Sequence, residues 1–376
     1  MQAPERKASL APPGFNYILG TQTIGAKYQF TDKTRLVETA ERILELGSNI
    51  LKICLDKRYA DLYALPKRED IQSLTDLATK EPSFKAVFDM PFTYYFLWAY
   101  RFGPGRWADG LSAPESEYRE IYDLARYLLE RYQGSGKTFF IGHWEGDWHL
   151  HAGYDRKRDP TPESIQRMID WLNIRQQGVD DAKRDTAAKR VQMYHYTEVN
   201  LVQKALQGGK CLTNDVLPHT RVDYVSYSSY DTVVPHKGNV RESLRKALDY
   251  IESKLPSKEG MAGRRVFIGE YGFPVEKETT PEMQDAYSRD VCRTAIEWGC
   301  PFVLYWQLYC NEIRDDKHRG FWLIDDKNQK QPFYFTLQDY FTRMKAFIAE
   351  FEQMHGRLPT GAEARVHALA ILAQPK

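Results

Sequence analysis

The chain has 376 residues, of which 42% are hydrophobic and 27% are charged, and its formal net charge is +1. This composition is typical of a globular enzyme, and a charge so close to zero gives no electrostatic reason to expect a nucleic acid or an acidic membrane as partner. No run of about 18 apolar residues is present, so we expect no transmembrane helix. The five cysteines show neither an even disulfide framework nor the spacing of a zinc site.

Short apolar runs of strand length alternate with longer segments along the chain. In chain order the predicted strands are Phe15–Leu19, Ile50–Leu55, Ala86–Phe88, Thr138–Ile141, Val191–Tyr196, Tyr224–Tyr227, Val266–Ile268 and Phe302–Trp306. Helical spacing of apolar residues predicts the helices Thr34–Leu46, Glu117–Tyr132, Thr161–Ala182, Val240–Leu255 and Pro281–Trp298.

Eight such strand–helix units predict an α/β fold, a single (β/α)₈ TIM barrel. The strands are apolar along their length, as in a parallel sheet covered on both faces. An open doubly wound sheet is the alternative, but the chain has no GxGxxG or GxxxxGK[ST] loop to accompany one. We expect a flexible, polar N-terminal segment (1–13) that does not resemble a signal peptide, the barrel (14–352) and a C-terminal extension (353–376). The cellular compartment and the oligomeric state stay open.

Two predicted strands lead into glutamates. Gly142 follows the fourth strand and is followed closely by Glu145, and Gly269 follows the seventh strand directly before Glu270. In a barrel the chemistry lies at the carboxyl ends of the strands. Two carboxyl groups facing each other across a pocket can cleave a glycosidic bond, one by protonating the leaving oxygen and the other by attacking the sugar. Each glutamate could also be an ordinary structural acid, but together they favour a catalytic pair.

The order of these residues resembles clan A of the retaining β-glycoside hydrolases. The segment Gly269–Pro274 is similar to the nucleophile strand of that clan, and residues 320–325 with 332–334 resemble the stretch before its final helix. The resemblance implies that Glu145 is the acid/base and Glu270 the nucleophile, that the substrate is a β-linked carbohydrate, and that no cofactor is needed. It also places a sugar platform, Trp306, at the end of the eighth strand.

One position departs from the clan, which usually has an asparagine before the acid/base to bind the 2-hydroxyl of the substrate. Here that position is Trp144. Either another residue supplies the contact, or the sugar or its binding mode is unusual, or the chemistry at the fourth strand has changed. Glu198, which we expect to begin the helix after the fifth strand, is the substitute acid if Glu145 fails. The candidate substrate-binding residues are Trp144, Trp148, His195, Tyr227 and Trp306.

A retaining mechanism sets two further expectations. The carboxyl groups of Glu145 and Glu270 should lie about 5–5.5 Å apart. The pKa of Glu145 should lie above that of Glu270, so that Glu145 holds a proton near the working pH. Tyr227, when it is not simply part of the core, could hold the carboxylate of Glu270 by a hydrogen bond.

A rival interpretation comes from the residues that follow the fourth strand. On an extended strand, alternation places every second side chain on one face, and such a face could bind Zn²⁺ or Mn²⁺ in a metal-dependent hydrolase. The alternating residues are His143, Glu145, Asp147, His149 and His151. On an extended strand they would span about 13 Å, which is too far for one metal ion unless the chain folds back. A third interpretation is a carbohydrate-binding barrel without catalytic activity.

Overall fold

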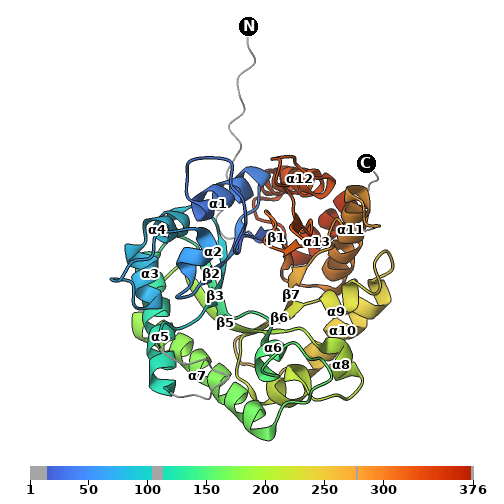
Figure 1. Cartoon of the computed structure of the whole chain (residues 1–376). Coiled ribbons are helices and arrows are strands. Elements are labelled where there is room, and N and C mark those ends of the chain that lie inside the picture. The colour runs from blue at the N-terminus through green and yellow to red at the C-terminus, as the bar shows by residue number, and fades with distance from the viewer. Residues whose placement is uncertain (1–14, 104–112, 277, 374–376) are drawn as a thin grey trace.

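The apolar runs form eight parallel strands that close into a barrel surrounded by helices (Figure 1). The structure, a computed structural model, describes residues 15–103, 113–276 and 278–373, so the predicted flexible segment 1–13 lies outside it. Each strand pairs with the next in chain order, and β8 closes on β1 through Leu19 and Val303. The predicted (β/α)₈ barrel is therefore confirmed. The strands are β1 (Leu19–Gln22), β2 (Ile50–Leu55), β3 (Tyr94–Ala99), β4 (Thr138–Gly142), β5 (Gln192–Val199), β6 (Tyr224–Ser228), β7 (Val266–Tyr271) and β8 (Val303–Tyr305).

The helices cover the outside of the barrel, and short helices lie at its rim. They are α1 (Arg35–Leu46), α2 (Tyr59–Tyr63), α3 (Leu74–Lys80), α4 (Pro82–Asp89), α5 (Pro114–Arg131), α6 (Gly146–Leu150), α7 (Pro162–Thr186), α8 (Val202–Leu206), α9 (Tyr230–Val233), α10 (Arg241–Lys254), α11 (Pro281–Trp298), α12 (Pro332–His355) and α13 (Gly361–Leu372). A small hairpin, β9 (Ile313–Arg314) and β10 (Lys317–His318), follows β8. None of the helices in the described ranges is long and apolar enough to cross a membrane.

The third predicted strand, Ala86–Phe88, is wrong, because these residues lie in α4. Glu81 caps this helix by accepting the backbone N–H of Phe84, and Pro82 occupies its first turn. The third strand is the aromatic run Tyr94–Ala99, which is almost wholly buried between the barrel interior and the helices. The first strand begins at Leu19, where the predicted strand ended. The other six predicted strands overlap the observed ones.

Aromatic rings fill the barrel below the site. Phe96 and Phe140 stack with their ring centroids 4.4 Å apart, and Phe267 and Phe302 pack against Phe96. A second core of aliphatic and aromatic residues lies between the strands and the helices. The barrel is therefore a packed core rather than a pore, and any ligand must bind at its rim.

Residues 353–373 of the predicted C-terminal extension form part of the packed structure. Helix α12 runs to His355, and α13 packs against α11 and α12. A capping box fixes the start of α13, in which Thr360 accepts the backbone N–H of Glu363 and Glu363 accepts that of Thr360.

Candidate active site

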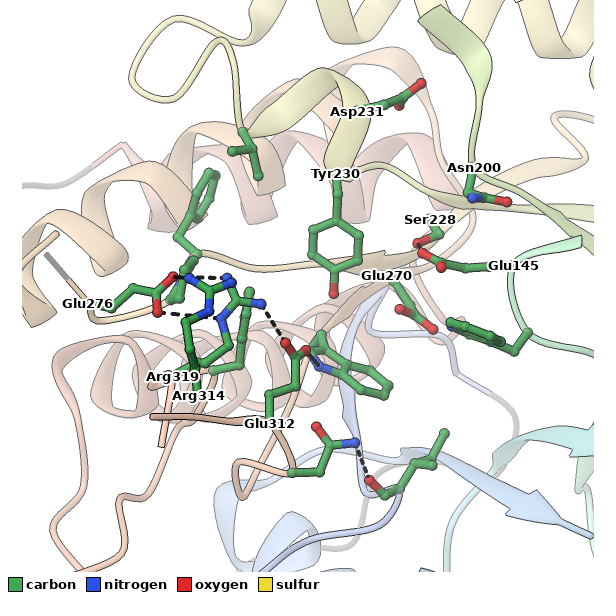
Figure 2. Close-up of a pocket in the computed structure, with 18 of the residues that line it drawn as sticks. Glu145, Asn200, Ser228, Tyr230, Asp231, Glu270, Glu276, Glu312, Arg314 and Arg319 are labelled. Carbon is green, nitrogen blue, oxygen red and sulfur yellow. Dashed lines mark hydrogen bonds and ion pairs between the residues drawn. The ribbon is translucent and has the colours of Figure 1, made fainter. Parts of the chain in front are cut away.

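A pocket with a volume of about 1020 Å³ opens at the carboxyl ends of the strands, and Glu145 and Glu270 both line it (Figure 2). Glu270 belongs to β7, and Glu145 lies between β4 and α6. Both glutamates are nearly buried, with 9% and 2% of their surfaces exposed for Glu145 and Glu270. The structure therefore brings together two acids that are separated by more than a hundred residues in sequence.

Glu145 is held by side chains from two elements. Its carboxyl group accepts hydrogen bonds from Ser228 Oγ at 2.6 Å and from Trp148 Nε1 at 2.5 Å. Its backbone N–H donates to Glu198 Oε1 at 2.9 Å. Both oxygens and the main chain of Glu145 are thus fixed before any ligand binds.

A buried lysine from β2 holds Glu270. Lys52 Nζ lies 3.3 Å from Glu270 Oε1 and 3.2 Å from Glu198 Oε2, and it donates to the carbonyl oxygen of Gly269. The ammonium also lies 4.3 Å from the ring centroid of Trp98. Because Glu198 bonds the backbone of Glu145, Lys52 and Glu198 link the two pocket glutamates from behind.

The position of Glu198 differs from the one expected from the sequence. It does not begin a helix but belongs to β5, fully buried, and it also accepts a hydrogen bond from Ser226 Oγ at 2.6 Å. A side chain at position 269 would not fit beside this contact, because its Cβ would lie 1.8 Å from Ser226 Oγ. Gly269 therefore allows the carboxylate of Glu198 and the strand that carries Glu270 to approach closely.

Lys52 is not among the predicted site residues, although its place in the sequence is unusual. Lys52 is the charged residue inside the apolar strand Ile50–Leu55, where every side chain is buried. A lysine is almost never fully buried unless it is paired. Its carboxylate partners lie far away in sequence, so the pattern indicates a buried pair without naming the partner.

Burial shifts both glutamates toward their protonated forms. It raises the pKa of Glu145 to about 7, with a further rise from the charge of Glu198 and opposing effects from the hydrogen bonds of Ser228 and Trp148. Burial also raises the pKa of Glu270 well above its ordinary value, against the attraction of Lys52. The structure therefore does not show the expected order, with Glu145 above Glu270, because Glu270 is buried at least as deeply.

All three predicted substrate-binding tryptophans line the pocket. Trp144 and Trp148 flank Glu145, and Trp306 comes from the end of β8. The indole N–H of Trp306 donates to Glu312, which Arg319 holds in turn by an ion pair of 2.6 Å (Figure 2). The ring of Trp306 is thus fixed by the segment around the β9–β10 hairpin.

The other two predicted binding residues lie outside this pocket. His195 is fully buried behind it and accepts a hydrogen bond from Arg175 Nε, and burial lowers the pKa of His195 well below its ordinary value. The hydroxyl of Tyr227 donates to Asp231 rather than to Glu270. The predicted fifth strand ended too early, because β5 continues to Val199 and His195 lies in its middle, whereas Tyr227 is the second-last residue of β6.

Two pocket-lining donors, neither of them among the predicted binding residues, have no hydrogen-bond partner within the described ranges. These are Nε1 of Trp98, at the end of β3, and Nδ2 of Asn200, directly after β5. Both side chains are at least nine-tenths buried. Buried polar groups are normally paired, so these two donors are positioned to receive an acceptor from a ligand. Figure 2 shows Asn200 beside Ser228 and Glu145.

The rival metal site rests on a geometry that does not form. Strand β4 ends at Gly142, and residues 146–150 turn into α6, so the five alternating side chains do not share one extended face. His143 Nε2 lies 2.7 Å from Thr197 Oγ1, and the carboxylate of Asp147 accepts three backbone N–H groups. In the part of the chain that the structure describes, no three His, Cys, Asp or Glu side chains are grouped to hold a metal ion.

Fold and site together define the class: a (β/α)₈ barrel with two buried glutamates in one rim pocket, at the ends of β4 and β7. No family profile and no curated protein matches the sequence. Solved structures of glycoside hydrolases do match the fold, at low sequence identity.

A GH5_18 protein from Streptomyces cattleya, in complex with Manβ1-4GlcNAc, has 12% identity and a TM-score of 0.55, with 94% of this chain and 89% of that chain covered. A GH5_18 protein from Bifidobacterium longum subsp. infantis has 15% identity and a TM-score of 0.55, covering 86% and 78% of the two chains. The exo-β-1,4-mannosidase Op5Man5 from Opitutaceae bacterium strain TAV5 has 11% identity and a TM-score of 0.56, covering 90% and 60%. The resemblance to clan A glycoside hydrolases is thus confirmed in fold.

Proposed function

We propose that this protein is a retaining glycoside hydrolase that cleaves a β-glycosidic bond of an oligo- or polysaccharide with Glu145 and Glu270. The observation that carries the proposal is the meeting of these two glutamates in one pocket, at the strand ends β4 and β7. A pair of carboxyl groups at a sugar site is the minimal equipment for glycoside hydrolysis. The glycoside hydrolases that share the fold make this chemistry the first to test.

The proposed reaction has two steps. Glu270 attacks the anomeric carbon and forms a covalent glycosyl-enzyme, while Glu145 gives its proton to the departing oxygen. Glu145 then takes a proton from the incoming water, which displaces Glu270. A pKa of about 7 lets Glu145 hold a proton near neutral pH. The ammonium of Lys52, 3.3 Å away, favours the ionised form of Glu270 that the attack requires.

Trp306 is proposed as the sugar platform, and the two unpaired donors as contacts to sugar hydroxyls. Asn200 is our candidate for the contact that clan A enzymes make with the asparagine before the acid/base. It lines the same pocket from the end of β5, and its Nδ2 donor is unpaired. Hydrogen bonds to the 2-hydroxyl that strengthen in the transition state can supply several kcal/mol.

The test is a panel of 4-nitrophenyl β-glycosides with matching β-1,4-linked manno- and gluco-oligosaccharides. Proton NMR of the first-formed product should show retention of the anomeric configuration. An inverted product would contradict the double displacement. If the protein binds oligosaccharides but hydrolyses none of these substrates, the non-catalytic carbohydrate-binding barrel would be favoured.

Variants assign the two roles. Glu270→Ala should lose nearly all activity, and azide should restore turnover by giving a glycosyl azide of inverted configuration. Glu145→Ala should retain first-step cleavage of an aryl glycoside whose leaving group needs no protonation, and azide should then give a product of retained configuration. Glu163→Ala, an exposed glutamate in the first turn of α7, is the matched control and should behave as the wild type.

A chelator separates this proposal from the metal-dependent rival. Dialysis against a strong chelator should leave the activity unchanged. Loss of activity that Zn²⁺ or Mn²⁺ restores would contradict the two-glutamate mechanism.

A further inference from the structure

An exposed aromatic ring packs against the two tryptophans that line the pocket beside Glu145. Tyr154, in the segment that follows α6, has 72% of its surface exposed. Its ring centroid lies 5.6 Å from that of Trp148 and 6.3 Å from that of Trp144. Because both tryptophans line the pocket, the three rings form one aromatic surface that runs from the pocket to solvent. We call these three residues the aromatic ledge.

The ledge belongs to one particular side of the reaction centre. Trp148 donates its indole N–H to Glu145, so the ledge begins at the proposed acid. It is built from residues after β4, whereas Trp306 comes from β8, and these two strands are opposite each other in the eight-stranded barrel. In the proposed reaction Glu145 protonates the leaving oxygen, so the group that departs lies on its side.

We propose that the aromatic ledge binds the sugar units of the leaving group, with Tyr154 as the outermost contact. This inference rests on the proposed function and adds the residues that hold the departing part of the oligosaccharide. A sugar ring has an apolar face that packs on an aromatic ring, and a tyrosine ring gives a large, rigid contact area. Trp148 serves the first sugar beyond the cleaved bond, and Tyr154 serves a sugar further out.

The experiment compares two substrates that differ in their leaving groups: a 4-nitrophenyl β-glycoside and the β-1,4-linked trisaccharide of the same sugar. For each enzyme we form the ratio of kcat/KM on the trisaccharide to kcat/KM on the aryl glycoside. Tyr154→Ala should lower this ratio roughly two- to tenfold, as expected for one lost aromatic contact. Tyr154→Phe should restore it, because the ring rather than the hydroxyl carries the contact.

Phe335→Ala is the matched control. Phe335 is another exposed aromatic residue, 46% exposed on α12, and it does not line the catalytic pocket. Both kcat/KM values should stay at the wild-type level in this variant. An unchanged ratio in Tyr154→Ala, or an equal loss on both substrates, would overturn the ledge and leave the proposed function standing. A wild type that hydrolyses no glycoside would overturn both.

Discussion

Replacing Lys52 by methionine tests the buried network behind the two glutamates. The ammonium lies 3.2 Å from Glu198 and 3.3 Å from Glu270, and none of the three side chains is more than 2% exposed. At an effective dielectric constant of about 20, unit charges at this separation attract by about 5 kcal/mol, which largely offsets the cost of removing them from water. Methionine keeps the length of the side chain and leaves two buried carboxylates without a counter-ion. We expect the free energy of unfolding to fall by about 3–5 kcal/mol near neutral pH.

The loss should depend on pH with a definite sign. Without the ammonium, the already raised pKa of Glu270 rises further, so the folded protein binds a proton that the unfolded chain releases. Stability then falls as the pH rises, because the unfolded state binds fewer protons. The deficit of Lys52→Met relative to the wild type should be smaller near pH 5 than near pH 8. The ascending limb of the kcat/KM profile should also move to higher pH, since Glu270 must ionise to attack.

Urea unfolding at both pH values measures the effect, and Glu198→Gln completes a double-mutant cycle. If Lys52 and Glu198 interact as the structure shows, the double variant should be less destabilised than the sum of the two single variants. A loss below about 1 kcal/mol at both pH values, or strictly additive losses, would refute the reasoning.

Three further predictions concern single positions. Burial raises the pKa of Glu145 to about 7. Its protonated form therefore stabilises the folded state below the ordinary pKa of a glutamate, and this contribution is lost as the pH rises through about 7. The free energy of unfolding should fall by about 3 kcal/mol over this pH range because of Glu145. Glu145→Gln should remove that part of the pH dependence from unfolding curves, and an unchanged slope would show that Glu145 titrates normally. Gly269→Ala should lower the free energy of unfolding by about 1–3 kcal/mol, because its Cβ would overlap the side chain of Ser226. Gly361→Ala is the control and should change it little, since a Cβ has room there. Equal effects of the two substitutions would contradict the close packing of Gly269 against Ser226. Trp98→Phe removes an unpaired indole N–H, so kcat/KM on a glycoside should fall about tenfold. Full activity would show that this donor contacts no substrate.

The sequence determined the alternation of strands and helices, and this was sufficient for the barrel. Strand-length apolar runs separated by helical periodicity leave few other folds, because parallel strands need covering helices. It also placed Glu145 and Glu270 at the same rim, since the carboxyl ends of all strands in a closed parallel barrel meet there. The wrong strand prediction at Ala86–Phe88 also comes from reading a local pattern, because a short apolar run fits a strand and one side of a helix equally well.

Only the tertiary structure decided which residues surround the two glutamates. Lys52 and Glu198 are 146 residues apart, and closure of the barrel brings their side chains within 3.2 Å. His195 lies in the middle of β5 and Tyr227 near the end of β6, and both side chains pack behind the pocket. Periodicity is a property of neighbouring residues and so can be read along the chain. The side chains that face one another across the rim depend on the register and twist of eight strands together, and the sequence of any one strand does not specify them.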